Sequence, residues 1–143
     1  MTTKFNQLLM MALVIAVAPL ARGQTLKTIH SFQFSDGAYP QNQGSLVVGG
    51  DGSLYGTTGG GGENLYGTIF RITTSGIMTT LYSFDGLNGV LPTAGLVKGS
   101  DGLLYGSTIR GGNDGGGTLF KITTNGTLST LFSFENVDGR NTL

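Results

Sequence analysis

The sequence contains two copies of one segment, and this duplication constrains the fold more than any other feature. Residues 46–84 and 96–134, aligned at an offset of 50, are identical at 22 of 39 positions. A shorter phrase occurs three times, at residues 28–32, 80–84 and 130–134. Such repeats are typical of architectures in which each unit is stabilised by stacking on its neighbours. We expect units at about residues 28–79 and 80–129 and a partial third unit at 130–143.

Each unit is predicted to consist of short strands separated by turns. The runs at 80–84, 95–98, 103–108 and 118–123 are rich in β-branched and aromatic residues, which favour strands. Asn125-Gly126 is a strong hairpin signal that joins the run at 118–123 to the run at 127–132, where the next unit is expected to open. Gly126 is expected to have a positive φ. Ser75-Gly76 does the same one repeat earlier.

The apolar pattern predicts an all-β chain of propeller-type blades. After the N-terminal segment no window shows an apolar period of 3.6 residues, so no helix is expected. Ile69 and Phe70 are adjacent and both apolar, which indicates a sheet covered on both faces. Four strands in about 50 residues match a propeller blade of the kelch size class, whereas the coils of a β-solenoid, the alternative, are shorter. We expect about two four-stranded blades and the first strand of a third.

The N-terminus is predicted to be a signal peptide at residues 1–23. Lys4 precedes the unbroken apolar run 8–18, which is helical in a signal peptide and too short to span a membrane. Pro19 ends the helix, and Ala21 and Gly23 place small residues before a cleavage site at Gln24. A core helix is the alternative. The sequence has no Cys, so a lipoprotein anchor is excluded. The remaining region, 24–143, is expected to be secreted or displayed on a bacterial cell surface.

The repeated phrases resemble those of one family. Asp-Gly-x-Leu-Tyr-Gly, Gly-Thr-(Ile/Leu)-Phe-(Arg/Lys)-Ile-Thr-Thr and Thr-Leu-(Tyr/Phe)-Ser-Phe occur in both units. They are similar to the GloVer (Gloeobacter/Verrucomicrobia) tandem repeat over residues 28–139. This resemblance implies an exported choice-of-anchor protein with no established catalytic role. More loosely, the chain resembles propeller repeats of sensor-kinase ectodomains and of virginiamycin B lyase.

The sequence offers little catalytic chemistry. His30 is the only histidine and aligns with Tyr82 and Phe132, so it is expected to fill the same structural position. No Gly-x-Ser-x-Gly elbow occurs. The glycine-rich loops at 59–62 and 111–117 lack the lysine of a phosphate-binding loop, and a strand follows each. We expect no catalytic residue and no cofactor.

Two sets of residues are candidates for binding. Asn113 and Asp114 carry oxygens that suit calcium, although the other copy of the loop has no aspartate and a plain turn is the alternative. Tyr55 and Tyr105 could stack on a sugar and still form hydrogen bonds, but a tyrosine at a fixed strand position also packs between blades. The repeated aspartates that precede them form either turns or a ring on one face. These aspartates are Asp51 and Asp101.

The sequence therefore predicts an exported, non-enzymatic β-repeat protein that acts as an extracellular or cell-surface interaction module. A sugar-binding propeller built from short chains and a fragment of a propeller lyase or lactonase are the alternatives. The formal net charge of +0 gives no footprint for nucleic acid, so the expected partner is a protein or a carbohydrate. Two blades leave apolar faces uncovered, and self-association is expected as well.

Overall fold

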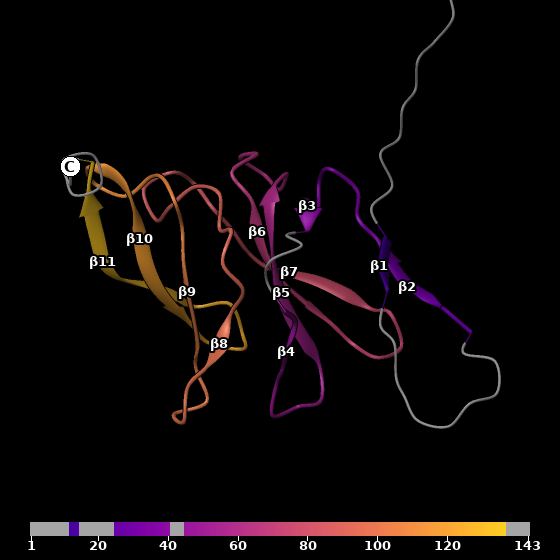
Figure 1. Ribbon diagram of the computed structural model, residues 1–143. Helices are drawn as coiled ribbons and strands as arrows, with labels where there is room; N and C mark the ends of the chain where they lie inside the picture. Colours follow the sequence, from indigo (N-terminus) through magenta and orange to yellow (C-terminus); the bar gives the residue numbers. More distant parts are fainter. Residues whose placement is uncertain (1–11, 15–24, 41–44, 137–143) are drawn as a thin grey trace, which may run out of the picture.

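Every regular element in the described residues is a β-strand (Figure 1). The computed structural model describes residues 12–14, 25–40 and 45–136. Two large antiparallel sheets lie side by side, and a small two-stranded sheet lies beside the first of them (Figure 1). The all-β prediction is confirmed. In the described ranges, no helix has the length and apolar character that a membrane crossing needs.

The first large sheet is a meander in which each strand pairs with the next along the chain. Its strands are β4 (Val47–Val48), β5 (Leu54–Gly60), β6 (Thr68–Ile72) and β7 (Met78–Ser83). A further short strand, β3 (Ala38–Pro40), pairs with the end of β5 beyond the reach of β4. Short antiparallel connections of this kind are what the turn residues between the runs predict.

The second large sheet repeats strands β4–β7 of the first sheet, one by one. It consists of β8 (Val97–Lys98), β9 (Leu104–Ser107), β10 (Gly115–Ile122) and β11 (Leu128–Glu135), again paired in sequence order. The expected strands are therefore present, with ends that differ by a few residues. The sequence duplication is a duplication of a folded unit.

The register is duplicated as well. The ladder between β6 and β7 shifts after Ile69, and the ladder between β10 and β11 shifts after the aligned Leu119. A single bridge between Val90 and Arg110 stands where β3 pairs with β5 in the first unit. A register shift at the same place twists both sheets in the same way, so the two sheets present equivalent faces.

The structure places two of the expected unit starts at the ends of sheets. The phrases at 80–84 and 130–134 were expected to open new units, yet they lie at β7 and β11, the last strands of the two sheets. A short hairpin cannot carry the chain out of its sheet, because the strand that follows it pairs with the strand before it. The run at 130–134 therefore completes the second sheet and does not start a third.

The hairpin between β10 and β11 is confirmed, with a different loop. Gly126 has a φ of +95°, as predicted, but Asn125 is not among the residues with positive φ. Thr123 and Thr127 close the loop through a backbone hydrogen bond of 3.0 Å, and the N–H of Gly126 bonds to the carbonyl of Thr123 at 3.0 Å. The loop therefore has three residues, 124–126, with glycine in the left-handed position that follows a type I turn.

The predicted N-terminal signal helix is not shown. Ala12–Val14, within the apolar run, forms strand β1, and the rest of the predicted helix lies outside the described residues. β1 pairs with β2 (Thr28–Ser31), the first copy of the thrice-repeated phrase. An unpaired strand edge accepts any extended segment nearby, which accounts for a strand at this position.

Two apolar clusters hold the three sheets together. Between the large sheets, the ring of Phe84 meets that of Phe120 edge-on, with centroids 5.4 Å apart. Between β2 and the first large sheet, Phe32 meets Phe70 in the same way at 5.0 Å. The fully or nearly buried residues of the first cluster are Tyr55, Ile69, Phe84, Leu96, Leu104, Phe120 and Ile122. The same aromatic contact therefore joins each sheet to the one before it.

Candidate functional site

Asp51, a candidate binding residue, organises the turn between β4 and β5. One carboxylate oxygen accepts the backbone N–H of Ser53 at 3.1 Å, and the other accepts the hydroxyl of Tyr55 at 3.1 Å. Arg71 Nη1 lies 3.8 Å from the second oxygen, a long and partly exposed ion pair that adds little. The ring of Tyr55 is fully buried between the large sheets and has no face open to a ligand.

The second copy of this cluster is more open. Asp101 accepts the N–H of Leu103 at 3.1 Å and the hydroxyl of Tyr105 at 2.7 Å. Tyr105 is only half-buried, because no further sheet of the described chain covers the side of β9 from which it projects. Of the four candidates, Tyr105 and the two aspartates reach the surface, and each already has a partner within its own turn.

These contacts shift the acid–base equilibria of the clusters. The hydroxyl of Tyr105 lowers the pKa of Asp101, and the N–H of Leu103 acts in the same direction. In the first copy, the N–H of Ser53 is the main cause that lowers the pKa of Asp51. The pKa of Tyr105 is raised by its bond to the carboxylate, and the pKa of Tyr55 is raised chiefly by burial. Each pair is therefore held as a carboxylate and a neutral phenol.

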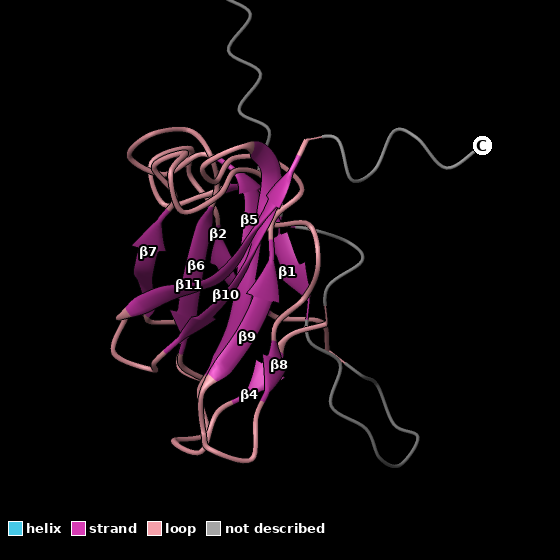
Figure 2. Cartoon of the chain, turned by 90° about the vertical axis from the view of Figure 1, so that its left-hand side faces the viewer, coloured by secondary structure: helices cyan, strands magenta, loops and turns pink. Residues whose placement is uncertain are grey.

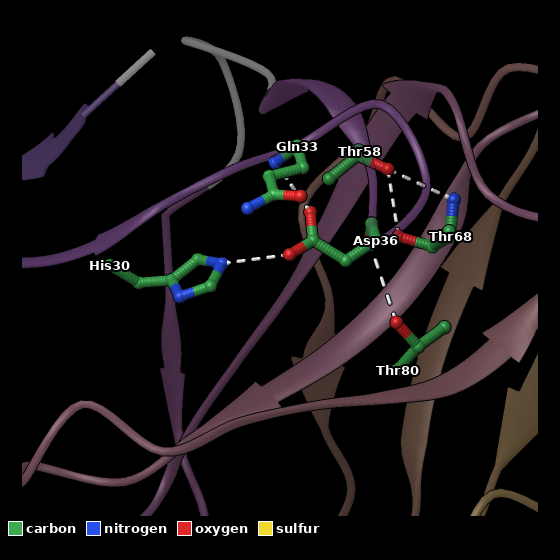
Figure 3. Close-up of polar contacts among 6 residues, drawn as sticks. All are labelled: His30, Gln33, Asp36, Thr58, Thr68 and Thr80. Atoms are coloured by element: carbon green, nitrogen blue, oxygen red, sulfur yellow. Dashed lines mark hydrogen bonds and ion pairs between the residues drawn. The ribbon is translucent and has the colours of Figure 1, made fainter. Parts of the chain in front are cut away.

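A second polar cluster surrounds Asp36, in the linker between β2 and β3 (Figure 3). Its carboxylate accepts the N–H of Gln33 at 2.8 Å and lies 3.1 Å from Nε2 of His30. Its backbone carbonyl accepts the hydroxyl of Thr68 at 3.2 Å and that of Thr80 at 3.5 Å. The turn therefore ties the first copy of the phrase to the sheet that follows it.

His30 occupies the position that its alignment predicts. Its ring meets that of Phe32 edge-on, with centroids 5.0 Å apart. The other two copies of the phrase form the same kind of pair, Tyr82 with Phe84 at 5.4 Å and Phe132 with Phe134 at 4.9 Å. The imidazole is thus one member of a repeated aromatic pair, with Asp36 as its polar partner.

Each linker is hydrogen-bonded to a pair of buried threonines in the sheet that follows it. The hydroxyls of Thr58 and Thr68 lie 2.8 Å apart on neighbouring strands, and those of Thr108 and Thr118 lie 3.0 Å apart in the second sheet. The hydroxyl of Thr118 donates to the carbonyl of Asn88 at 2.8 Å, as that of Thr68 donates to the first linker. Buried hydroxyls need such partners, and each pair provides a fixed polar anchor for the incoming linker.

Glycine follows each anchored linker residue for a steric reason. Gly37 and Gly89 have φ values of +147° and +129°. A Cβ at either would lie 2.5 Å from the side chain of Thr58 or Thr108. These contacts explain why Asp36-Gly37 and Asn88-Gly89 recur. The third copy, Asp138-Gly139, lies outside the described residues.

The glycine-rich loops also bind the linkers, through backbone hydrogen bonds. The N–H of Gly62 donates to the carbonyl of Phe34 at 2.9 Å, and the N–H of Gly112 donates to that of Gly86 at 2.9 Å. A Cβ on the neighbouring Gly61 would lie 2.5 Å from the same carbonyl of Phe34. Close approach of two backbones accounts for glycine here, and these N–H groups already have acceptors within the chain.

The calcium candidates lie in an exposed loop before β10. Asn113 and Asp114 are both exposed, and the N–H of Asn113 donates to the hydroxyl of Ser133 at 2.9 Å. Among the residues that the structure describes, no group of three or more His, Asp or Glu side chains could hold a metal ion. The loop is a turn tied to β11 through its backbone.

Sequence reasoning missed the threonine pairs and the serine that anchors each glycine-rich loop. Ser83 accepts the N–H of Glu63 at 2.8 Å, as Ser133 does for its own loop. A signal was present, because both threonines and this serine are identical in the two aligned units although they are polar. Identity at a polar position between repeats points to a contact that every unit makes.

The repeated contacts define a tandem β-repeat protein in which polar anchors and an aromatic pair lock each sheet to the phrase before it. The chain belongs to the Gloeobacter/Verrucomicrobia repeat family, whose model matches residues 14–143. This match confirms the resemblance seen in the sequence. Searches of curated proteins and of solved structures found no match.

Proposed function

We propose that this protein is an exported, non-catalytic repeat module that binds another macromolecule at or outside the bacterial cell surface, and that its two large sheets are propeller-type blades. The observation that carries the proposal is the repeated interface. Many residues that are identical in the two units form the contacts between one sheet and the next. A repeat of this kind builds an extended surface from copies of one unit.

The arrangement of the sheets supports the blade proposal. The second sheet is a meander of four strands in sequence order, the first has the same meander with β3 added, and the two sheets pack face to face through Phe84 and Phe120. Radial repetition of four-stranded sheets is the construction principle of propellers. The glycines at the close approaches, such as Gly61 and Gly111, fit sheets that crowd together at one end.

The proposal of a non-catalytic role follows from what the polar residues do. His30 contacts Asp36 and Phe32, and each repeated aspartate bonds to a tyrosine and to a turn N–H. A general acid or base must reach a substrate atom, and these groups are directed to partners within the fold.

Export is tested by N-terminal sequencing of protein recovered from outside the cytoplasm. The proposal predicts cleavage before Gln24, because small residues at 21 and 23 suit the peptidase. Ala21→Phe should block cleavage, whereas the control Thr2→Ala should leave it unchanged. Exported protein that still begins at Met1 or Thr2 would overturn the assignment of a cleaved leader.

A further inference from the structure

The first large sheet binds the second through one of its faces. The outer face of the second large sheet carries the counterparts of the residues that form this contact. Six side chains of the first sheet pack into the cluster between the sheets: Val47, Tyr55, Ile69, Leu81, Tyr82 and Phe84. We call their counterparts on the second sheet the donor face: Val97, Tyr105, Leu119, Leu131, Phe132 and Phe134. Figure 2 looks onto the side of the molecule where β8–β11 lie in front.

The donor face is uncovered in the described part of the chain. Phe84 is 0% exposed, whereas its counterpart Phe134 is 39% exposed. Ile69 is 0% exposed, whereas Leu119 is 39% exposed. A contiguous apolar face of this kind marks an interaction surface, and its counterpart within the same chain shows what it fits.

The complementary surface is the acceptor face, which each large sheet turns toward the phrase before it. In the second sheet this face includes Leu96 and Leu104, which are 3% and 1% exposed under the first sheet. In the first sheet the corresponding residues are Leu46 and Leu54, which are only partly buried. The full set on the first sheet is Leu46, Leu54, Phe70, Ile72 and Met78.

A single short segment covers the acceptor face of the first sheet. Residues 28–32 supply three of the six donor positions, at Ile29, His30 and Phe32, and of these Ile29 and Phe32 pack on this face. β2 pairs only with β1, which lies in the proposed leader. A whole sheet that carried all six positions would bury more apolar surface than this segment does, and would compete with it for the same site.

We propose that the donor face of one chain docks on the acceptor face of a second copy, in place of residues 28–32 of that copy. The proposal deepens the interaction role given above, on which it rests, by naming the partner. The interface repeats the internal one, with Phe134 against Phe70 of the second copy as Phe84 lies against Phe120. The described chain contains three copies of the phrase, at 28–32, 80–84 and 130–134, but only two acceptor faces. In the proposed assembly, residues 28–32 of each copy are therefore left without an acceptor face.

Head-to-tail contacts of this kind form rings when the rotation between copies closes. Closed propellers have about four to eight blades. If each copy contributes the two large sheets that the structure describes, a closed ring contains about two to four copies.

Sedimentation equilibrium on purified exported protein tests the proposal. It compares a variant expected to weaken association between copies with one expected to strengthen it. The wild type should form a discrete oligomer at about 100 µM, a concentration that reveals micromolar association. Phe134→Asp should be monomeric, whereas the control Leu65→Asp, at a loop residue 59% exposed, should assemble like the wild type. Phe32→Ala weakens the competing segment and should lower the dissociation constant at least about tenfold.

The double variant Phe32→Ala/Phe134→Asp separates docking from aggregation. It should be monomeric, because it has a free acceptor face and no donor face, whereas a misfolded protein would still aggregate. A monomeric wild type, or a Phe134→Asp variant that assembles normally, would overturn the proposal. Unchanged association in Phe32→Ala would overturn the head-to-tail arrangement in favour of two donor faces meeting. N-terminal sequencing of the same sample reports separately whether the proposed leader, and with it β1, is still present.

Discussion

At the scale of single residues, each unit depends on a few polar contacts that recur at the same places. A buried threonine pair anchors the linker, and a glycine after the anchored residue lets the two backbones meet. An aspartate caps the turn between the first two strands of each sheet and accepts a tyrosine hydroxyl. These residues are conserved between the units because each unit folds through the same contacts, which makes their roles testable by substitution.

Gly89→Ala should destabilise the protein much more than Gly102→Ala. Gly89 has a φ of +129°, and a Cβ would lie 2.5 Å from Thr108, whereas Gly102 has a φ of +81° with nothing within 4 Å. The free energy of unfolding should fall by roughly 3 kcal/mol for Gly89→Ala, from backbone strain and the clash together. It should fall by about 1 kcal/mol for Gly102→Ala, from backbone strain alone. Urea unfolding of both variants measures the difference. Equal losses would show that the threonine pair does not confine the linker.

The pair of Asp101 and Tyr105 should make stability depend on pH at both ends of the range. The pKa of Asp101 is lowered in the fold, so its contribution exists above the ordinary value of 3.8 and disappears as the pH falls through the lower folded value. The pKa of Tyr105 is raised, so its contribution exists below the ordinary value of 10.0 and disappears as the pH rises through the higher folded value.

Tyr105→Phe removes this hydrogen bond and tests both limits. The difference in melting temperature between wild type and variant should be largest between about pH 5 and 9 and should shrink in acid and in alkali. Tyr66→Phe serves as the control, since its hydroxyl forms no hydrogen bond with the described residues and the residue is 42% exposed. A difference for Tyr105→Phe that stays constant from pH 3 to 11 would contradict the assignment.

At the scale of elements, strands and turns were predictable because their signals are local. The run at 118–123 and the turn at Gly126 follow from residue types within a few positions. The sheet to which the run at 130–134 belongs was not, because strand pairing is a tertiary property. The positive φ values of Tyr39 and Leu91 at aligned positions before proline have no local signal either, since residues of these types rarely adopt them.

The candidate site was predictable only in part, for the same reason. A turn was one of the two interpretations given for Asp51 and Asp101, the other being a ring on one face. Tyr55 and Tyr105 have the same local sequence, yet one is buried and the other half-buried. Their difference depends on whether another sheet covers them, which no local pattern reports.

Gly126→Val should destabilise the hairpin between β10 and β11 more than a change elsewhere in the loop. Gly126 has a φ of +95°, and a Cβ would lie 2.6 Å from the carbonyl oxygen of Leu81. A β-branched residue is a genuine outlier at such a φ, so we expect a loss of about 2 kcal/mol or more. Thr124→Val, at an exposed position of the same loop, is the control. Similar melting temperatures for the two variants would argue against this loop geometry.

At the scale of the whole molecule, the protein is a stack in which each sheet binds the phrase before it through one aromatic contact. Phe32 lies against Phe70, and Phe84 lies against Phe120. Phe134 is the third member of the series, and no sheet of the described residues covers it. The stability of a repeat protein is approximately the sum of the stabilities of its units and of the interfaces between neighbours. The contribution of each phenylalanine to the free energy of unfolding should therefore depend on whether it lies in such an interface.

The most direct test of this account compares Phe84→Ala with Phe134→Ala by urea unfolding, at a concentration where the protein sediments as a monomer. The two residues hold the same repeat position and differ in whether a following sheet covers them. Phe84→Ala should lower the free energy of unfolding by about 3–5 kcal/mol, the usual effect of removing a buried phenylalanine. Phe134→Ala should lower it by less than about 1 kcal/mol. Equal losses, or a larger loss for Phe134→Ala, would contradict the stacking of the two sheets through this interface.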